Sequence, residues 1–131
     1  MISVSKLKCN CCLFIIGGLL YGLVEIIWRH YTHWSMILTG GLCFVLLYRI
    51  FKKITECSLC LKCIIGSIII TFIEFFAGFI FNFRLKLNVW DYSGCPLNFC
   101  GQICLIYSFL WGMLTMPIIA ICKFLDKKFS L

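Results

Sequence analysis

Two glutamates, Glu25 and Glu74, stand within long apolar stretches of the sequence. On membrane-insertion scales an ionised side chain within hydrocarbon costs at least about 2.5 kcal/mol unless it is paired, protonated or hydrated. Arg29 follows Glu25 by four residues, so on a helix the two side chains lie on one face and can form an ion pair. These charged residues are the first candidates for chemistry in the chain.

More polar and aromatic residues are expected on the same side of the membrane as the two acids. Some follow the first apolar stretch in a short turn, and others lie in a longer connection at 82–100, a length that is often functional. We predict one ligand site opening from the outer leaflet, with the acids at its base and Arg29 as counter-ion. The other residues predicted to bind there are His33, Trp90, Asp91 and Tyr92.

Each candidate also has a structural explanation. A network of buried ion pairs that only fixes the register of the helices would use the same acids. His33, Trp90 and Tyr92 are residue types common at membrane interfaces. Asp91 can equally cap a short outer helix or pair with Arg84. A ligand site and a structural network therefore both remain open.

The composition requires lipid as the surrounding solvent. Of the 131 residues, 63% are apolar, which leaves too little polar surface for a soluble globule. About 20 apolar residues cross the hydrocarbon, and runs of this length are helices rather than alternating barrel strands. We predict a single all-α membrane domain over residues 1–131, a four-helix bundle. Its spans are expected at about 9–28, 34–51, 59–81 and 101–122.

The cations predict the orientation in the cell membrane. With four spans, nine of the twelve cations fall on the side of the termini and three on the other side. The positive-inside rule therefore places both termini in the cytoplasm. The cations sit beside the spans rather than along one soluble face, so the net charge of +7 does not indicate a nucleic-acid partner.

The eleven cysteines raise the question of a metal site or a disulfide. Cys57, Cys60 and Cys63 have metal-like spacing, but two of them run into an apolar stretch, where cysteine behaves as a small hydrophobic residue. We expect no metal and no cofactor. Cys95 and Cys100 both lie in the expected outer connection and could form a disulfide.

Small residues form a stripe on each expected helix. Gly18, Gly22 and Glu25 share one face, as do small polar residues around Glu74, and Gly40 and Gly41 allow close approach. In lipid there is no hydrophobic driving force between helices, so membrane helices associate through the close packing that such stripes of small residues allow. The stripes of the third and fourth helices are Ser67, Thr71, Glu74 and Gly78, and Gly101, Cys104, Ser108, Gly112 and Thr115.

The segments that carry these residues resemble a family of bacterial membrane proteins, named putative ABC-transporter type IV or putative ABC transporter permease. The similarity covers about residues 13–125, and its most specific part is a W-D-Y-S segment followed by N-x-x-G. The matching segments are 28–36, 39–43, Glu74 with Gly78, 88–93, 96–98, 101–105, Ser108 and 111–112.

The resemblance implies a role in transport and adds Asn98 to the candidate ligand-binding residues. The sequence has no phosphate-binding loop of an ATPase. The transporter assignment therefore implies a separate ATPase subunit, a homo-oligomer, or both. This sequence departs from the family in extra cysteines such as Cys95 and Cys100, which leaves open whether any thiol chemistry is shared.

Three functions remain open at this point. The first is a transporter-like subunit that binds a polar or cationic solute, or the headgroup of a lipid, at the outer charged site. The second is a membrane-embedded enzyme acting on lipid, which is disfavoured because the sequence has no H-E-x-x-H, G-x-S-x-G or aspartate-rich pair. The third is an assembly or regulatory partner without a ligand. No catalytic residue is assigned.

Overall fold

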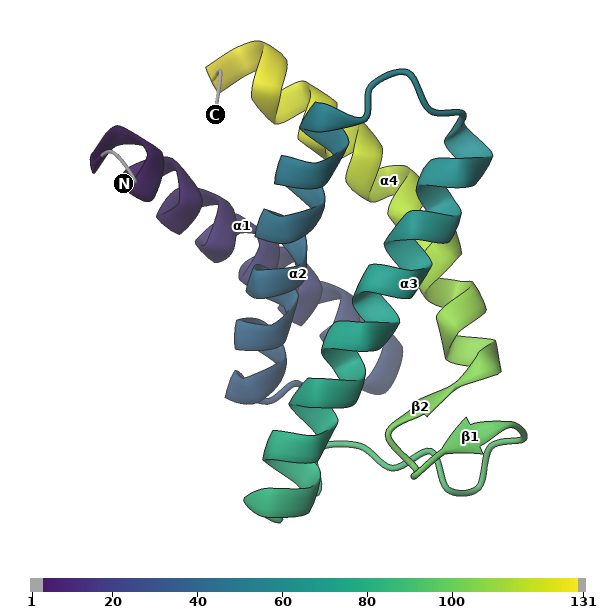
Figure 1. Cartoon of the computed structure of the whole chain (residues 1–131). Helices are drawn as coiled ribbons and strands as arrows, with labels where there is room; N and C mark the ends of the chain where they lie inside the picture. The colour runs from purple at the N-terminus through teal and green to yellow at the C-terminus, as the bar shows by residue number, and fades with distance from the viewer. Residues whose placement is uncertain (1–3, 130–131) are drawn as a thin grey trace. The chain divides into compact units, whose positions relative to one another are not determined.

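The computed structural model describes residues 4–129. Within this range four helices are long and apolar enough to cross a membrane, which confirms the all-α, four-helix prediction. They are α1 (Val4–Arg29), α2 (Trp34–Lys53), α3 (Leu59–Gly78) and α4 (Leu105–Phe129), shown in Figure 1. The chain is thus a multi-pass membrane protein.

The connection between α3 and α4 contains the remaining regular structure. A π-helix, η1 (Phe79–Arg84), continues α3 directly, and a two-stranded antiparallel ladder follows. Its strands are β1 (Asn98–Phe99) and β2 (Ile103–Cys104). The fourth span begins at Leu105 rather than at the expected residue 101, because the preceding residues pair with β1 instead of joining the helix.

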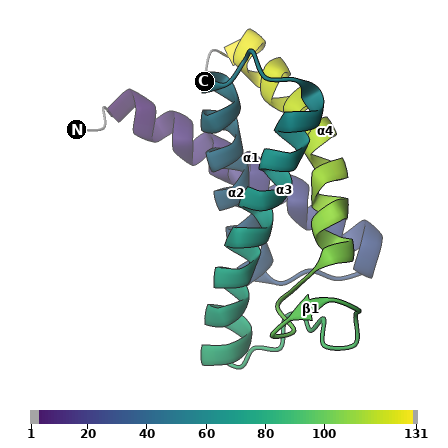
Figure 2. The ribbon, with the colours of Figure 1, turned by 45° about the vertical axis from the view of Figure 1, so that its right-hand side comes forward.

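The described chain forms two compact units. The first unit holds the residues up to Thr55 together with those from Pro117 onward, and the second unit holds Glu56–Met116. Helix α4 belongs to both and can be followed as one continuous helix in Figures 1 and 2. It passes from one unit to the other at Pro117, a residue that removes a backbone N–H from the helix.

In the first unit, glycines bring α1 and α2 together. A Cβ at Gly18 would lie 2.8 Å from the carbonyl oxygen of Ile37, and one at Gly41 would lie 2.7 Å from that of Phe14. Because higher numbers on α1 meet lower numbers on α2, the helices are antiparallel. The prediction that small residues let these two helices approach closely is therefore confirmed.

Polar contacts join three helix ends in the same unit. The Arg49 Nε of α2 donates to Asn10 Oδ1 near the start of α1 at 2.9 Å. The Tyr48 hydroxyl donates to Asp126 Oδ1 near the end of α4 at 2.9 Å, and Lys52 forms an ion pair with the same oxygen at 3.2 Å. The start of α1 and the ends of α2 and α4 therefore meet.

In the second unit, α3 packs on the first half of α4 through part of the predicted stripes. Ser108, Gly112 and Thr115 lie on α4 as predicted, but Gly101 and Cys104 precede the helix, so their place in the stripe was wrong. The Ser67 hydroxyl donates to the carbonyl oxygen of Ser108 at 2.6 Å, and the hydroxyls of Thr71 and Ser108 are 2.8 Å apart. Gly66, the residue before Ser67, faces Thr115, whose side chain is completely buried. These contacts fix the rotation of α3, and with it the direction of Glu74.

Replacing Gly66 with Ala should destabilise the protein. The new methyl group would overlap the side chain of Thr115, with Cγ2 only 2.6 Å from the ideal Cβ position. Overpacking of this kind costs about 1–3 kcal/mol, whereas helix propensity alone favours Ala over Gly by about 1 kcal/mol. We expect a lower midpoint of thermal unfolding in detergent.

Gly94→Ala is the matched control, because nothing lies within 4 Å of a Cβ built at Gly94. Its unfolding midpoint should stay close to that of the unchanged protein. An unaltered or higher midpoint for Gly66→Ala would show that α3 and α4 are not packed closely at this position.

Candidate functional site

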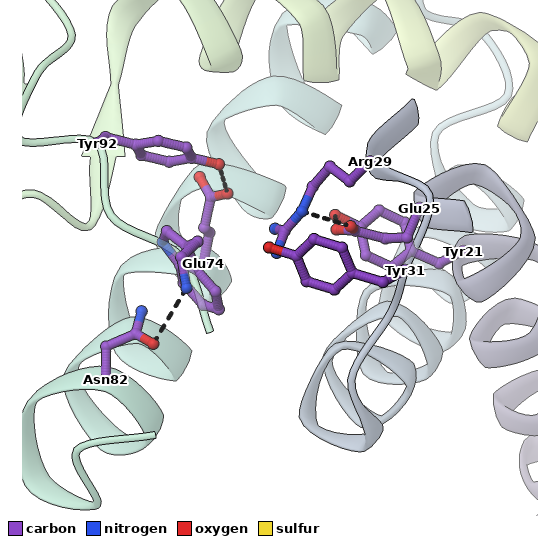
Figure 3. Close-up of polar contacts among 8 residues, drawn as sticks. Tyr21, Glu25, Arg29, Tyr31, Glu74, Asn82 and Tyr92 are labelled. Carbon is purple, nitrogen blue, oxygen red and sulfur yellow. Dashed lines mark hydrogen bonds and ion pairs between the residues drawn. The ribbon is translucent and has the colours of Figure 1, made fainter. Parts of the chain in front are cut away.

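The carboxylate of Glu74 is held by two neutral donors in the second unit. Glu74 lies one turn before the end of α3 and is 4% exposed. The Tyr92 hydroxyl donates to Oε2 at 2.8 Å, as Figure 3 shows, and Trp111 Nε1 donates to Oε1 at 3.1 Å. These hydrogen bonds offset part of the cost of burying the carboxylate.

Aromatic rings gather beside this carboxylate. The ring of Tyr92 stacks on that of Tyr107, with centroids 4.7 Å apart and an angle of 15° between the planes. Tyr107 in turn contacts Trp111, one turn further along α4, at a centroid distance of 6.1 Å. The site therefore combines one acid with three electron-rich rings.

Asn82 anchors the segment that carries Tyr92. Its Oδ1 accepts from the backbone N–H of Val89 at 2.7 Å and, at 3.4 Å, from that of Trp90. Its Nδ2 donates to the side-chain oxygen of Gln102 at 3.0 Å. Asn82 can do this from η1, and π-helical turns are frequent at functional sites.

Gly78 leaves the room that this arrangement needs. The indole Nε1 of Trp90 donates to the carbonyl oxygen of Gln102 at 2.9 Å, and Trp90 is 7% exposed. A Cβ at Gly78 would lie 3.0 Å from Trp90 Cζ2 and would overlap the Gln102 side chain. Trp90 is thus the buried anchor of the connection.

Asp91 and Asn98 tie the connection to itself. Asp91 Oδ1 accepts from the backbone N–H of Ser93 at 2.9 Å, and hydrogen bonds from Ser93 hold the pKa of this exposed carboxyl below its ordinary value. Asn98 donates to the carbonyl oxygen of Cys95 at 2.8 Å and accepts from the N–H of Gly101 at 3.0 Å. Both side chains shape the turn that holds Tyr92.

The second acid belongs to the first unit, where its predicted ion pair is confirmed. Glu25 is 5% exposed, and its Oε2 lies 3.3 Å from Arg29 Nε (Figure 3). The Tyr21 hydroxyl donates to the other carboxylate oxygen at 2.9 Å. Arg29 also donates to the Tyr31 hydroxyl at 2.7 Å and lies 4.6 Å above the centroid of that ring.

His33 starts α2. Its Nδ1 accepts from the backbone N–H of Ser35 at 3.2 Å and lies 2.7 Å from the Ser35 hydroxyl. This is the geometry of a helix N-cap, which satisfies an otherwise unpaired N–H of the first turn. The contacts give His33 a structural role.

The predicted site residues thus fall into two groups. Glu74 and Tyr92 are in direct contact, with Trp90, Asp91 and Asn98 supporting the same connection. Glu25 and Arg29 form their own pair in the first unit, which also holds His33. A shared cavity for both acids stays a prediction.

Four residues of the second unit were missing from the predicted site. They lie 8 to 37 positions from Glu74, and only the repeat of two aromatic residues four apart on the last span hinted at two of them. Their contacts hold either the Glu74 carboxylate or the segment that carries Tyr92. They are Asn82, Gln102, Tyr107 and Trp111.

The cysteines form no metal-binding cluster in the described part of the chain. Among residues 4–129 no group of three or more His, Cys, Asp or Glu side chains is arranged to hold a metal ion. Cys95 and Cys100 are free thiols rather than a disulfide pair.

A family model matches nearly the whole chain. The family is described as Putative ABC-transporter type IV, and the match covers residues 12–130. The chain belongs to this family. The match includes both acids, η1 and the segment that carries Tyr92, as the resemblance of the sequence predicts. No curated protein and no solved structure matches the chain.

Replacing Asn82 with Ala should loosen the connection between α3 and α4, which carries Tyr92. The N–H groups of Val89 and Trp90 would lose their hydrogen bonds to Asn82 Oδ1, and loss of the partner of a buried N–H costs about 1–3 kcal/mol. We expect hydrogen exchange at these two amides to be about tenfold faster or more, measured by mass spectrometry.

Asn10→Ala is the control, because it removes an asparagine that binds Arg49 in the first unit. It should leave exchange at residues 89 and 90 unchanged. Equal protection of these amides in Asn82→Ala would show that Asn82 does not hold the connection.

Proposed function

We propose that this chain is the membrane-embedded, ligand-binding subunit of a transporter, and that Glu74 binds the cationic end of a polar ligand. The observation that carries the proposal is the buried Glu74 carboxylate beside the rings of Tyr92, Tyr107 and Trp111. The family assignment supports transport in general, whereas the ligand class follows from the site.

An acid next to aromatic rings suits an organic ammonium group. The faces of tyrosine and tryptophan rings attract cations, and ammonium ligands with several methyl groups are bound in this way. A carboxylate adds a full opposite charge in a medium of low dielectric constant. The same chemistry would recognise an ammonium group on a free solute or on a lipid headgroup.

Hydrogen bonds from Tyr92 and Trp111 position the Glu74 carboxylate. Tyr92 and Trp111 bind one carboxylate oxygen each, so Glu74 is held in a fixed direction before any ligand arrives. A preorganised site spends less of its binding energy on ordering side chains. The donors come from the connection and from α4, so movement of either element would change the affinity of the site.

The transport role requires further subunits. The sequence has no phosphate-binding loop, so hydrolysis of a nucleotide would come from a separate ATPase subunit. A chain with four spans would also need a second copy or another membrane subunit to surround a path. We propose that the two units of this chain act as one membrane domain, since α4 continues through both.

Replacing Glu74 with Gln tests the ligand class. Tetramethylammonium chloride serves as the probe, and sodium chloride at the same ionic strength serves as the reference. At a hundred times its Kd, a ligand that binds only the folded state stabilises it by about 2.7 kcal/mol. We expect the probe to raise the unfolding midpoint of the unchanged protein and to have no effect on Glu74→Gln.

Glu56→Gln is the matched control, because Glu56 is an exposed acid in the short connection before α3. It should respond to the probe like the unchanged protein. Equal shifts in all three proteins, or no shift in any of them, would count against an ammonium site at Glu74.

We also propose that both termini lie in the cytoplasm. In the first unit, the start of α1 and the ends of α2 and α4 meet, and all three carry cations. Cytoplasmic loops and tails are enriched in Lys and Arg. The connection with Tyr92 would then lie on the outer side.

Fusions to reporter proteins test this orientation. A fluorescent protein fused after Leu131 should fluoresce, and alkaline phosphatase fused there should be inactive, because the phosphatase needs an oxidising compartment to form its disulfides. Phosphatase fused after Gly94 should be active. The reverse pattern would invert the proposed topology.

A further inference from the structure

The net charge of the chain is concentrated at one end of the first unit. Eight of the twelve cations, but only one of the five acids, lie in the first residues of α1 or in the last residues of α2 and α4. These three segments therefore carry the whole net charge of +7, and the remaining four cations and four acids cancel. We call the three segments the cationic end, and its cations are Lys6, Lys8, Arg49, Lys52, Lys53, Lys123, Lys127 and Lys128.

Packing and hydrogen bonds hold the cationic end together. Leu13 of α1, Tyr48 of α2 and Leu125 of α4 belong to one core cluster, and each is at most 7% exposed. The one acid of the end, Asp126, accepts from the Tyr48 hydroxyl at 2.9 Å and pairs with Lys52 at 3.2 Å. The three helix ends are thus fixed side by side, although their cations repel one another.

Membrane topology alone does not require this arrangement. The positive-inside rule counts Lys and Arg near the ends of the spans, wherever those ends lie relative to one another. Here the ends meet, and their single acid is already engaged by Lys52 and Tyr48. The exposed Lys53 and Lys127 form no ion pair with another residue of the described range 4–129. An anion from outside the chain would therefore find positive charge that one acid cannot balance.

Exposed apolar side chains stand among these cations. Leu7 lies between Lys6 and Lys8 and is 54% exposed, and Phe124 is 58% exposed. The Lys128 Nζ lies 5.7 Å from the centroid of the Phe124 ring. At a bilayer the apolar stem of lysine covers apolar surface while its charged head reaches the lipid headgroups. Cations mixed with exposed apolar residues suit a lipid phosphate with its acyl chains better than a soluble acidic protein.

We propose that the cationic end is a binding site for anionic phospholipid. Clusters of about four to eight Lys and Arg beside a membrane span attract anionic headgroups. The lipid phosphate would contact the lysines, and the acyl chains would lie against the exposed apolar residues of the same helix ends. Bound lipid would offset the repulsion among the cations. The proposal depends neither on what Glu74 binds nor on which side of the membrane the cationic end faces.

Native mass spectrometry of the purified full chain in detergent tests the proposal. Phosphatidylglycerol serves as the anionic probe, and zwitterionic phosphatidylcholine serves as the reference. We expect phosphatidylglycerol to bind about tenfold more tightly or more, because each lysine near an anionic surface contributes about fivefold. Raising ammonium acetate from about 0.05 M to about 0.5 M should weaken this preference, because salt screens exposed charges. Equal Kd values for the two lipids would overturn the proposal.

A pair of double variants locates the site. Lys53→Gln with Lys127→Gln removes two exposed cations and leaves the Lys52–Asp126 pair in place. It should weaken the binding of phosphatidylglycerol about tenfold or more and leave that of phosphatidylcholine unchanged.

Arg84→Gln with Lys86→Gln is the matched control, because it removes two exposed cations from the second unit. This variant should bind phosphatidylglycerol like the unchanged protein. Equal losses in the two double variants, or no loss when Lys53 and Lys127 are replaced, would show that lipid does not bind at the cationic end.

Two competitors separate a lipid from other anions. Ammonium phosphate at the ionic strength of the acetate buffer should not displace phosphatidylglycerol, because inorganic phosphate has no acyl chains to cover the exposed apolar residues. A poly-glutamate peptide at the same concentration as the lipid should not displace it either. Displacement by phosphate would indicate a site for free anions, and displacement by the peptide would indicate a site for an acidic protein. Either result would overturn the assignment to lipid.

Discussion

The hydrogen-bonded carboxylate of Glu74 is the constraint on which the second unit depends. A carboxylate 4% exposed on a membrane-spanning helix needs donors, and Tyr92 from the connection and Trp111 from α4 both donate to it. For Tyr92 to reach Glu74, the chain must turn back after η1. The anchors for that turn are Asn82 and Gln102, which are themselves hydrogen-bonded to each other.

Small residues make this geometry possible. Gly66 leaves room for the side chain of Thr115 on α4. Gly78 leaves room for Trp90 and Gln102 of the connection. In lipid there is little hydrophobic drive between helices, so such close contacts and interhelical hydrogen bonds supply the association. The residues that pack α3 on α4 therefore also aim the acid, and packing and site cannot be varied independently.

The two units concentrate different chemistry. In the first unit, cations gather where three helix ends meet, and the acid Glu25 is neutralised locally by Arg29. In the second unit, an acid lies beside aromatic rings and accepts hydrogen bonds from two of them. The family match covers both units, and the proposed ligand site uses only residues of the second unit.

The sequence by itself determined the four spans, the stripes of small residues and the Glu25–Arg29 pair. Each depends on length or on helical period, which are local properties of the chain. Only the tertiary structure decided that Tyr92 and Trp111, 18 and 37 positions away, donate hydrogen bonds to Glu74. It also decided that Asp91 accepts a hydrogen bond from the nearby Ser93. These contacts depend on which donors and acceptors a folded connection leaves to be satisfied, and no local pattern encodes that.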